Sequence, residues 1–239
     1  MVYAMSDIHG CYEKYMTLME GLELKDDDML YILGDIVDRG DGGIQVIMDV
    51  LKRKNVCCLR GNHEHDALMF LAEYAMPGGS GESDSLFAEF EPWLTDGGIS
   101  TYNAFLALDD RDKRRVLYFL RQMPIHKEMT AGGKVFHLSH TIASKSRMIH
   151  PEKCKMHDYL WGEPDYEDIY FKDKIMVTGH TPTAFIDEAY RGRIWKGNNH
   201  IALDCGAVFG NPLGCICLDT MEEIYADEKN IMRIGMKDR

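Results

Sequence analysis

Three motifs decide the fold: SDIHG at residues 6–10, GDIVDRG at residues 34–40 and RGNHE at residues 60–64. Each motif follows a short apolar run, at residues 2–5, 29–33 and 56–59, that predicts a buried strand. Between the motifs, residues 11–22 and 44–51 carry apolar side chains at helical spacing. Strands that alternate with helices in this way indicate a layered α/β domain.

The rest of the chain adds helices and then more strands. Helices are expected at about 64–76, 86–93, 99–106 and 110–122, and strands at 125–129, 135–139, 175–178, 201–204, 214–218 and 222–226. Residues 219–227 are acidic and predict a solvated hairpin. Residues 141–174 are polar and irregular, which is typical of a functional loop or lid. We therefore predict a single domain over residues 1–239, with a helical elaboration at about 77–122 and a substrate-side loop at about 141–174.

The composition indicates a folded, acidic protein. Of the 239 residues, 45% are apolar, which is enough for a sizeable core. Asp and Glu number 39 against 27 Lys and Arg, so the formal net charge is −12 and binding to nucleic acid or to an anionic membrane is not expected. No apolar run approaches the roughly 18 residues that a membrane span requires. The seven cysteines form no CxxC pair and are expected to be free thiols, which predicts a cytoplasmic protein.

Polar residues cluster where the predicted strands end. In an open α/β sheet, the loops at the carboxyl ends of strands meet in one crevice. Five such loops are expected to bring together six side chains with metal-binding atoms: Asp7, His9, Asp35, Asn62, His140 and His180. His137 shares a predicted strand with His140, but a period of two places them on opposite faces, and His140 lies at the end of the strand.

These six residues offer oxygen and imidazole donors without cysteine, which suits manganese, iron or zinc in a catalytic site. Six donors are too many for one ion that keeps an open position, and about right for two. Asp35 is central in the order and has two carboxylate oxygens, so it is the natural bridge. Two such ions form a clamp for in-line displacement at phosphorus, in which a bridging hydroxide attacks. We predict two divalent ions, with manganese as the first choice.

The three motifs resemble those of the PPP-type serine/threonine protein phosphatases, within the calcineurin-like metallophosphoesterase superfamily. Two later segments agree with this resemblance, VTGHTP at residues 177–182 and LDCGAVFG at residues 203–210. The resemblance runs from about residue 2 to residue 218 and is closest to the compact phage-lambda-type and bacterial members. It implies a two-sheet β-sandwich flanked by α-helices, with the layer order α-β-β-α.

The resemblance also implies a role for each motif residue. One ion would bind Asp7, His9 and Asp35, and the second would bind Asp35, Asn62, His140 and His180. His63 would be the general acid, held by Asp38, and the phosphate would be bound by Arg39, Arg60 and Asn62. A positioned imidazolium is expected to help a basic alkoxide to leave by roughly 10²–10⁴-fold, and a neighbouring carboxylate raises its pKa.

Two positions depart from the pattern of the small members of this family. Their further phosphate-binding arginine follows the tryptophan of an LW segment, but here residues 160–165 read LWGEPD, with Glu163 at that place. Arg147 is a candidate replacement for it. Thr141 replaces the glycine that follows the strand-end histidine. Both departures bear on substrate preference rather than on hydrolysis itself.

The leading hypothesis is a two-metal phosphomonoesterase that acts as a serine/threonine protein phosphatase, with a phosphoprotein, a phosphopeptide or a small phosphoester as substrate. The alternative is a symmetrical dinucleoside polyphosphate hydrolase that acts on diadenosine tetraphosphate, because such enzymes share the DxHG, GDxxxRG and GNH motifs. A non-catalytic protein-binding scaffold is a remote alternative. It is remote because the sequence retains every expected metal ligand and the acid histidine. The sequence leaves the oligomeric state open.

Overall fold

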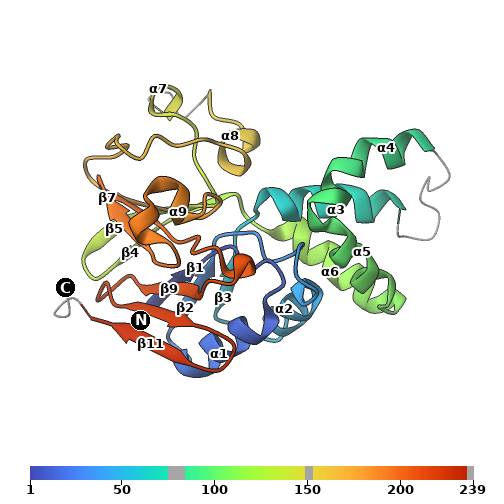
Figure 1. Ribbon diagram of the computed structural model, residues 1–239, viewed down its shortest axis with the longest axis horizontal. Coiled ribbons are helices and arrows are strands. Elements are labelled where there is room, and N and C mark those ends of the chain that lie inside the picture. The colour runs from blue at the N-terminus through green and yellow to red at the C-terminus, as the bar shows by residue number, and fades with distance from the viewer. Residues whose placement is uncertain (75–83, 149–152, 236–239) are drawn as a thin grey trace.

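The computed structural model describes residues 1–74, 84–148 and 153–235 of the chain. These residues form two β-sheets that share a buried core, with helices on the outer sides (Figure 1). The predicted α/β fold class, a two-sheet sandwich flanked by helices, is confirmed.

The first sheet has six strands in the order β11-β10-β9-β1-β2-β3. They are β1 (Val2–Met5), β2 (Met29–Ile32), β3 (Val56–Cys58), β9 (Leu213–Cys217), β10 (Glu223–Ala226) and β11 (Ile231–Ile234). The pairs β1–β2 and β2–β3 are parallel, whereas β9, β10 and β11 add an antiparallel half. Because β1, β2 and β3 run in the same direction, the loops that follow them emerge at one edge of the sheet.

The second sheet has five strands in the order β4-β5-β6-β8-β7. They are β4 (His126–Ala131), β5 (Lys134–Ser139), β6 (Ile175–Thr178), β7 (Trp195–Gly197) and β8 (His200–Ala202). Strands β5 and β6 pair in parallel, so the loops after them also emerge at one edge.

Buried apolar side chains fill the space on both faces of the first sheet. In β1, Ala4 points into a core shared with Leu138 and Val177 of the second sheet. Its neighbours along the strand, Tyr3 and Met5, belong to a separate core on the helical side. Since both faces of β1 are covered, the strand reads as a continuous apolar run rather than an alternating one.

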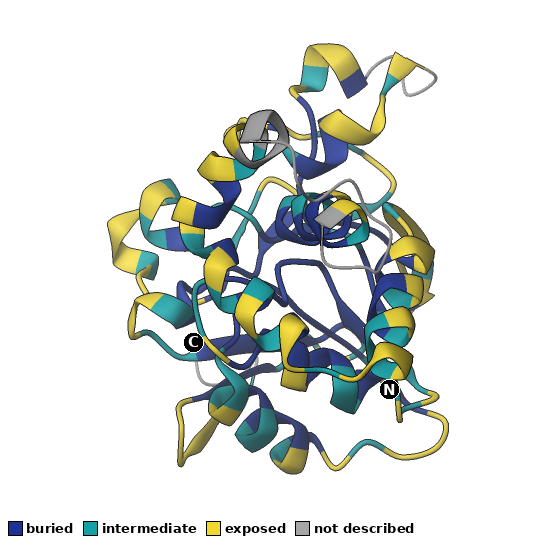
Figure 2. Cartoon of the chain, turned by 90° about the vertical axis from the view of Figure 1, so that its right-hand side faces the viewer, coloured by how far each residue is buried: buried dark blue, intermediate teal, exposed yellow. Residues whose placement is uncertain are grey.

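Helices form the outer layers. They are α1 (Tyr12–Leu22), α2 (Gly43–Val50), α3 (Asn62–Tyr74), α4 (Asp84–Trp93), the π-helical turn η1 (Leu94–Gly98), α5 (Ile99–Leu106) and α6 (Asp110–Gln122), followed by the short helices α7 (Lys145–Met148), α8 (Met156–Leu160), α9 (Thr183–Ile186), η3 (Glu188–Tyr190) and η4 (Ala207–Phe209). Helices α4, α5 and α6 contact α3 on one side of the sandwich, at the right in Figure 1. Their buried sides face inward and their exposed sides face solvent (Figure 2).

In the last third of the chain, the structure corrects one prediction and adds two strands. Residues 219–227 are not simply a solvated hairpin, because β10 lies between β9 and β11 and is buried along its whole length. The carboxylate of Glu223 accepts a hydrogen bond from Tyr225 and pairs with Lys196, which compensates the burial of its charge. Strands β7 and β11 have no counterpart among the predicted strands.

Three further observations concern the whole chain. All seven cysteines are free thiols, as predicted. Among the described residues, every helix is too short or too polar to cross a bilayer. The single domain over residues 1–239 and the substrate-side role of residues 141–174 stay predictions; the start of the helical elaboration, at residues 77–83, lies outside the described residues.

Candidate functional site

Five loops that leave the carboxyl ends of strands carry the predicted metal-binding residues. Asp7 and His9 follow β1, and Asp35 follows β2; Asn62 begins α3 after β3, while His140 and His180 follow β5 and β6. The loops are joined through their backbones, because the His9 amide donates to the Asp35 carbonyl at 2.8 Å and the Gly179 amide donates to the His140 carbonyl at 2.9 Å.

Several of these residues have a strained backbone. Asp7, His9, Asp35 and His180 have φ values of 54°, 43°, 54° and 69°, in the left-handed region that side chains other than glycine seldom occupy. Such conformations persist only where the surrounding structure imposes them, and they concentrate at functional sites.

One candidate ion site is built around His140. Its Nδ1 donates to the Leu33 carbonyl at 2.8 Å, so its Nε2 is left as the electron-pair donor. This Nε2 lies 2.9 Å from Asn62 Oδ1, 3.1 Å from His180 Nδ1 and 3.4 Å from Asp35 Oδ1. The four donors predicted for the second ion are therefore together.

A second candidate site shares Asp35 with the first. His9 donates from Nδ1 to the Val37 carbonyl at 3.0 Å, and its Nε2 lies 3.5 Å from Asp35 Oδ2. His63, which was predicted to be the acid, belongs to the same group, with its Nε2 3.9 Å from Asp35 Oδ2. Asp7 belongs to neither group of metal-binding atoms found among the described residues; its carboxylate accepts hydrogen bonds from the His180 amide at 3.0 and 3.1 Å. The two oxygens of Asp35 thus face different groups, as a bridging carboxylate requires.

The electrostatics of these groups favour cations. Burial raises the pKa of the Asp7 carboxyl well above its usual value, and the coulombic effects of Asp204 and Asp35 raise it further. Burial likewise raises the pKa of Asp35 to about 8. For the imidazoles, burial lowers the pKa of His9 and His140 far below the usual value and that of His180 to about 4. Neutral imidazoles beside buried carboxylates are the donors that divalent ions bind, so the residues fit two such ions.

The His63 imidazole is oriented by Asp38. His63 Nδ1 lies 2.7 Å from Asp38 Oδ2, and that carboxylate also accepts hydrogen bonds from the Trp93 indole and the Thr101 hydroxyl. Burial by itself lowers the pKa of His63, but the carboxylates of Asp35 and Asp38 outweigh it and raise the pKa to about 9. These two carboxylates thus favour the protonated imidazole, and the contact with Asp38 leaves Nε2 as the ring nitrogen that faces the candidate ion sites.

Arg39 lies between the imidazoles of His9 and His63. Its Nη1 donates to His9 Nε2 at 2.9 Å, and its Nη2 is 3.3 Å from His63 Nε2. The Asp96 carboxylate, in η1, pairs with Arg39 at 3.2 Å. Sequence reasoning missed Asp96, Trp93 and Thr101 because no motif marks them; all three come from the helices inserted after α3.

Two other arginines are placed differently from the prediction. The Arg60 guanidinium donates from Nη2 to the carbonyls of Leu120 and Arg121 at 2.9 and 3.0 Å. These carbonyls end α6, where the negative end of the helix dipole attracts a cation. The Arg147 guanidinium pairs with the Asp158 carboxylate at 2.7 Å, and its role as a replacement for the arginine that is missing at Glu163 stays a prediction. The structure therefore brings only Arg39, among the predicted phosphate-binding arginines, into contact with the ligand cluster.

Glu64 joins the second and third motifs. Its fully buried carboxylate accepts hydrogen bonds from the backbone amides of Asp35, Ile36, Val37 and Gly61, at 2.8, 2.7, 3.2 and 2.9 Å. Burial raises its pKa, although these amides act in the opposite direction. The sequence showed Glu64 only as the last letter of a motif; its role is to hold the loop that carries the shared ligand Asp35.

The Glu64→Ala variant is expected to lose about 3 kcal/mol or more of its free energy of unfolding, because each unpaired buried donor costs about 1–3 kcal/mol. Glu64→Gln keeps one carbonyl oxygen and should lose clearly less. Urea denaturation checks both values, with Glu20→Ala on the exposed side of α1 as the control. Equal stability of Glu64→Ala and the wild type would contradict the role of this carboxylate.

Comparisons with known proteins agree with this geometry. The model of the family described as calcineurin-like phosphoesterase matches residues 1–215. Among the curated relatives, the symmetrical bis(5'-nucleosyl)-tetraphosphatase of Wigglesworthia glossinidia brevipalpis is 32% identical over 74 residues, which are 30% of this chain and 27% of that protein. The enzyme of the same name from Buchnera aphidicola is 41% identical over 64 residues, 26% of this chain and 23% of that protein. The chain thus spans about a quarter of the length of the curated relatives that it matches.

Solved structures share the fold across several activities. A protein named as a candidate diadenosine tetraphosphatase superposes with a TM-score of 0.59 at 17% identity, over 98% of this chain and 92% of its own. A protein serine/threonine phosphatase from Saccharomyces cerevisiae superposes with a TM-score of 0.56 at 12% identity, over 98% of this chain and 78% of its own. At these identities the likeness shows the fold alone.

The prediction of a serine/threonine protein phosphatase is wrong, because the curated relatives that match are named as symmetrical tetraphosphatases. A protein substrate has no support, and the PPP-type assignment is unconfirmed. The three motifs predicted metal-assisted chemistry at phosphorus, which is common to both hypotheses, so they did not distinguish the two substrates. The family model matches nine-tenths of the chain and establishes the wider family: the protein belongs to the calcineurin-like phosphoesterases.

Proposed function

We propose that the protein hydrolyses symmetrical dinucleoside tetraphosphates, with diadenosine tetraphosphate as the representative substrate and a nucleoside diphosphate as the product. One structural observation carries the phosphoester chemistry, namely two groups of metal-binding atoms that share Asp35. The names of the curated relatives support the choice of substrate. Two divalent ions, with manganese as the first choice, would activate water and stabilise charge on the reacting phosphate.

The chain's own residues have distinct tasks in this proposal. Arg39 binds phosphate oxygens beside the ion sites, since a guanidinium matches phosphate geometry. His63 donates the proton on Nε2 to the leaving oxygen, and Asp38 keeps the imidazole charged and oriented. The oxygen of water joins one central phosphorus, the bond from that phosphorus to the central bridging oxygen breaks, and two nucleoside diphosphates leave. Free thiols and a nucleotide substrate fit a reducing cytoplasmic compartment.

The test is the product pattern with and without metal. With manganese, diadenosine tetraphosphate should yield ADP only, and a chelator should stop the reaction until manganese is added in excess. A phosphoserine peptide serves as the comparison substrate. Equal amounts of AMP and ATP would show asymmetric cleavage and refute the proposal, as would turnover of the phosphopeptide in a preparation that leaves diadenosine tetraphosphate intact.

A further inference from the structure

An exposed aromatic ring lies beside the candidate site. Phe209 is the last residue of η4, and 63% of its surface is exposed to solvent. The centre of its ring is 5.8 Å from the guanidinium carbon of Arg39. Single exposed apolar side chains are common on protein surfaces, so the indication of a ligand comes from the position of this ring beside Arg39 and not from its exposure alone.

The turn that carries Phe209 is held firmly. Its amide donates to the Gly206 carbonyl at 3.0 Å, and Asn211 donates from its side chain to the same carbonyl at 3.2 Å. Lys14 reaches across from α1 and donates to the carbonyls of Ala207 and Asn211 at 2.7 and 2.8 Å. The backbone under the ring is therefore fixed before any ligand binds, which lowers the entropy cost of stacking on it.

Arg39 separates the ring from the metal-binding imidazoles. The Arg39 guanidinium contacts the imidazoles of His9 and His63, and it also lies over the Phe209 ring. In a nucleoside polyphosphate, the base is likewise separated from the reacting phosphate by further phosphate and a ribose. A ligand that places phosphate against Arg39 can thus place its base over Phe209.

We propose that Phe209 is the stacking platform for one nucleobase of the substrate. The identity of the ligand rests on the function proposed above. Every base has an aromatic face, and stacking one base on such a side chain changes affinity by roughly 5- to 150-fold. Because the ring offers no hydrogen-bonding group, this platform accepts different bases.

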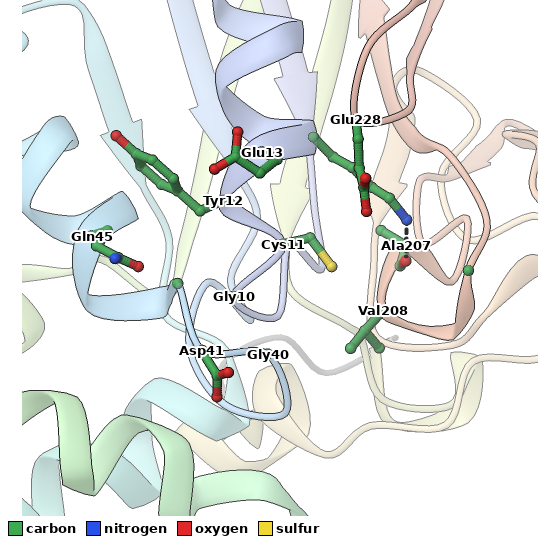
Figure 3. A pocket seen from close by; sticks show the side chains of 13 residues that line it. Gly10, Cys11, Tyr12, Glu13, Gly40, Asp41, Gln45, Ala207, Val208 and Glu228 are labelled. Carbon is green, nitrogen blue, oxygen red and sulfur yellow. Dashed lines mark hydrogen bonds between the residues drawn. The ribbon is translucent and has the colours of Figure 1, made fainter.

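A cavity of about 520 Å³ is lined in part by the same turn and is the competing place for the base (Figure 3). Val208 and Gly210 line it from the turn, and Gln45 and Asp41 line it from α2 and the preceding loop. Its other charged groups are Glu13, Glu228 and Lys14, and the Lys14 ammonium is bound to backbone carbonyls. The excess of carboxylates repels a phosphate chain, which favours Phe209 as the platform.

The experiment compares two inhibitors that differ by one nucleoside. ADP and pyrophosphate are measured as inhibitors of para-nitrophenyl phosphate hydrolysis at a fixed free manganese concentration. In the wild type, ADP should bind about tenfold or more tightly than pyrophosphate. Phe209→Ala should abolish this preference, whereas Phe209→Tyr, which keeps an aromatic ring, should retain it. Tyr118→Ala is the matched control, because Tyr118 is 66% exposed on α6 and belongs to no part of the site.

Several outcomes would overturn the platform. In the wild type, the contradicting result is equal inhibition by ADP and pyrophosphate. In the variants, it is an unchanged preference for ADP in Phe209→Ala, or loss of that preference in Phe209→Tyr or Tyr118→Ala. Loss of the preference in Gln45→Ala would place the base in the cavity instead. The readout does not require turnover of diadenosine tetraphosphate. Failure of the proposed function shows separately, as the absence of ADP from that substrate.

Discussion

Replacement of Asp35 by asparagine is expected to lower kcat by about 10³-fold or more and to weaken the binding of both ions. Asp35 Oδ1 lies 3.4 Å from His140 Nε2, and Oδ2 lies 3.5 Å from His9 Nε2, so this carboxylate alone belongs to both groups. Asparagine offers one oxygen and no charge. Metal ions supply several kcal/mol of transition-state stabilisation, and each 1.36 kcal/mol corresponds to a factor of ten in rate.

Metal content and turnover should be measured on the same preparations. The ratio of bound manganese to protein should fall from two toward zero in Asp35→Ala, whereas His9→Ala should weaken mainly one site. Asp26→Asn removes a carboxylate from an exposed turn and is the control for the loss of one negative charge. If Asp35→Ala retained both ions, the assignment of Asp35 as the shared ligand would have to be abandoned.

The sequence predicted much of the fold because its motifs follow strands buried on both faces. Strands β1 and β6 and helices α5 and α6 have the predicted boundaries, since their apolar runs or helical periods are uninterrupted. Strand β11 was missed because it lies at the edge of its sheet, where Met232 is exposed and no alternation is required. Strand β10 was misread because its acidic residue Glu223 is buried with partners that only the tertiary structure supplies.

The candidate site likewise combines residues that the sequence predicted with residues that it did not predict. Five of the six predicted ion ligands come from a motif and His140 comes from the end of a predicted strand. The structure brings these residues to one place because parallel strands deliver their loops to one edge. Trp93 and Asp96 reach Asp38 and Arg39 from distant helices, and no local pattern records such a contact. Arg60 belongs to a motif, yet its guanidinium donates to the carbonyls at the end of α6. Substrate choice was predicted least well, because residues outside the motifs determine it.

His63→Asn is expected to lower kcat by roughly 10²-fold or more on alkyl phosphates, whose alkoxide leaving groups need a proton. The loss should be much smaller on para-nitrophenyl phosphate, which has a weakly basic leaving group. Diadenosine tetraphosphate should behave like the latter, because its leaving oxygen becomes a terminal phosphate with a pKa of about 6. Asp38→Asn should give the same pattern in weaker form, since Asp38 acts only through the hydrogen bond to His63 Nδ1.

The dependence on the leaving group decides between two roles for His63. The imidazole lies 2.7 Å from Asp38, as an oriented acid should, but its Nε2 is also 3.9 Å from Asp35 Oδ2, within the group of metal-binding atoms that includes His9. An acid protonates the departing oxygen, so its removal should lower kcat more when that oxygen is more basic. The manganese content should then stay at two per chain. A ligand acts on the ion, so equal losses on all three substrates, together with a lower manganese content, would show that His63 holds metal and does not donate a proton.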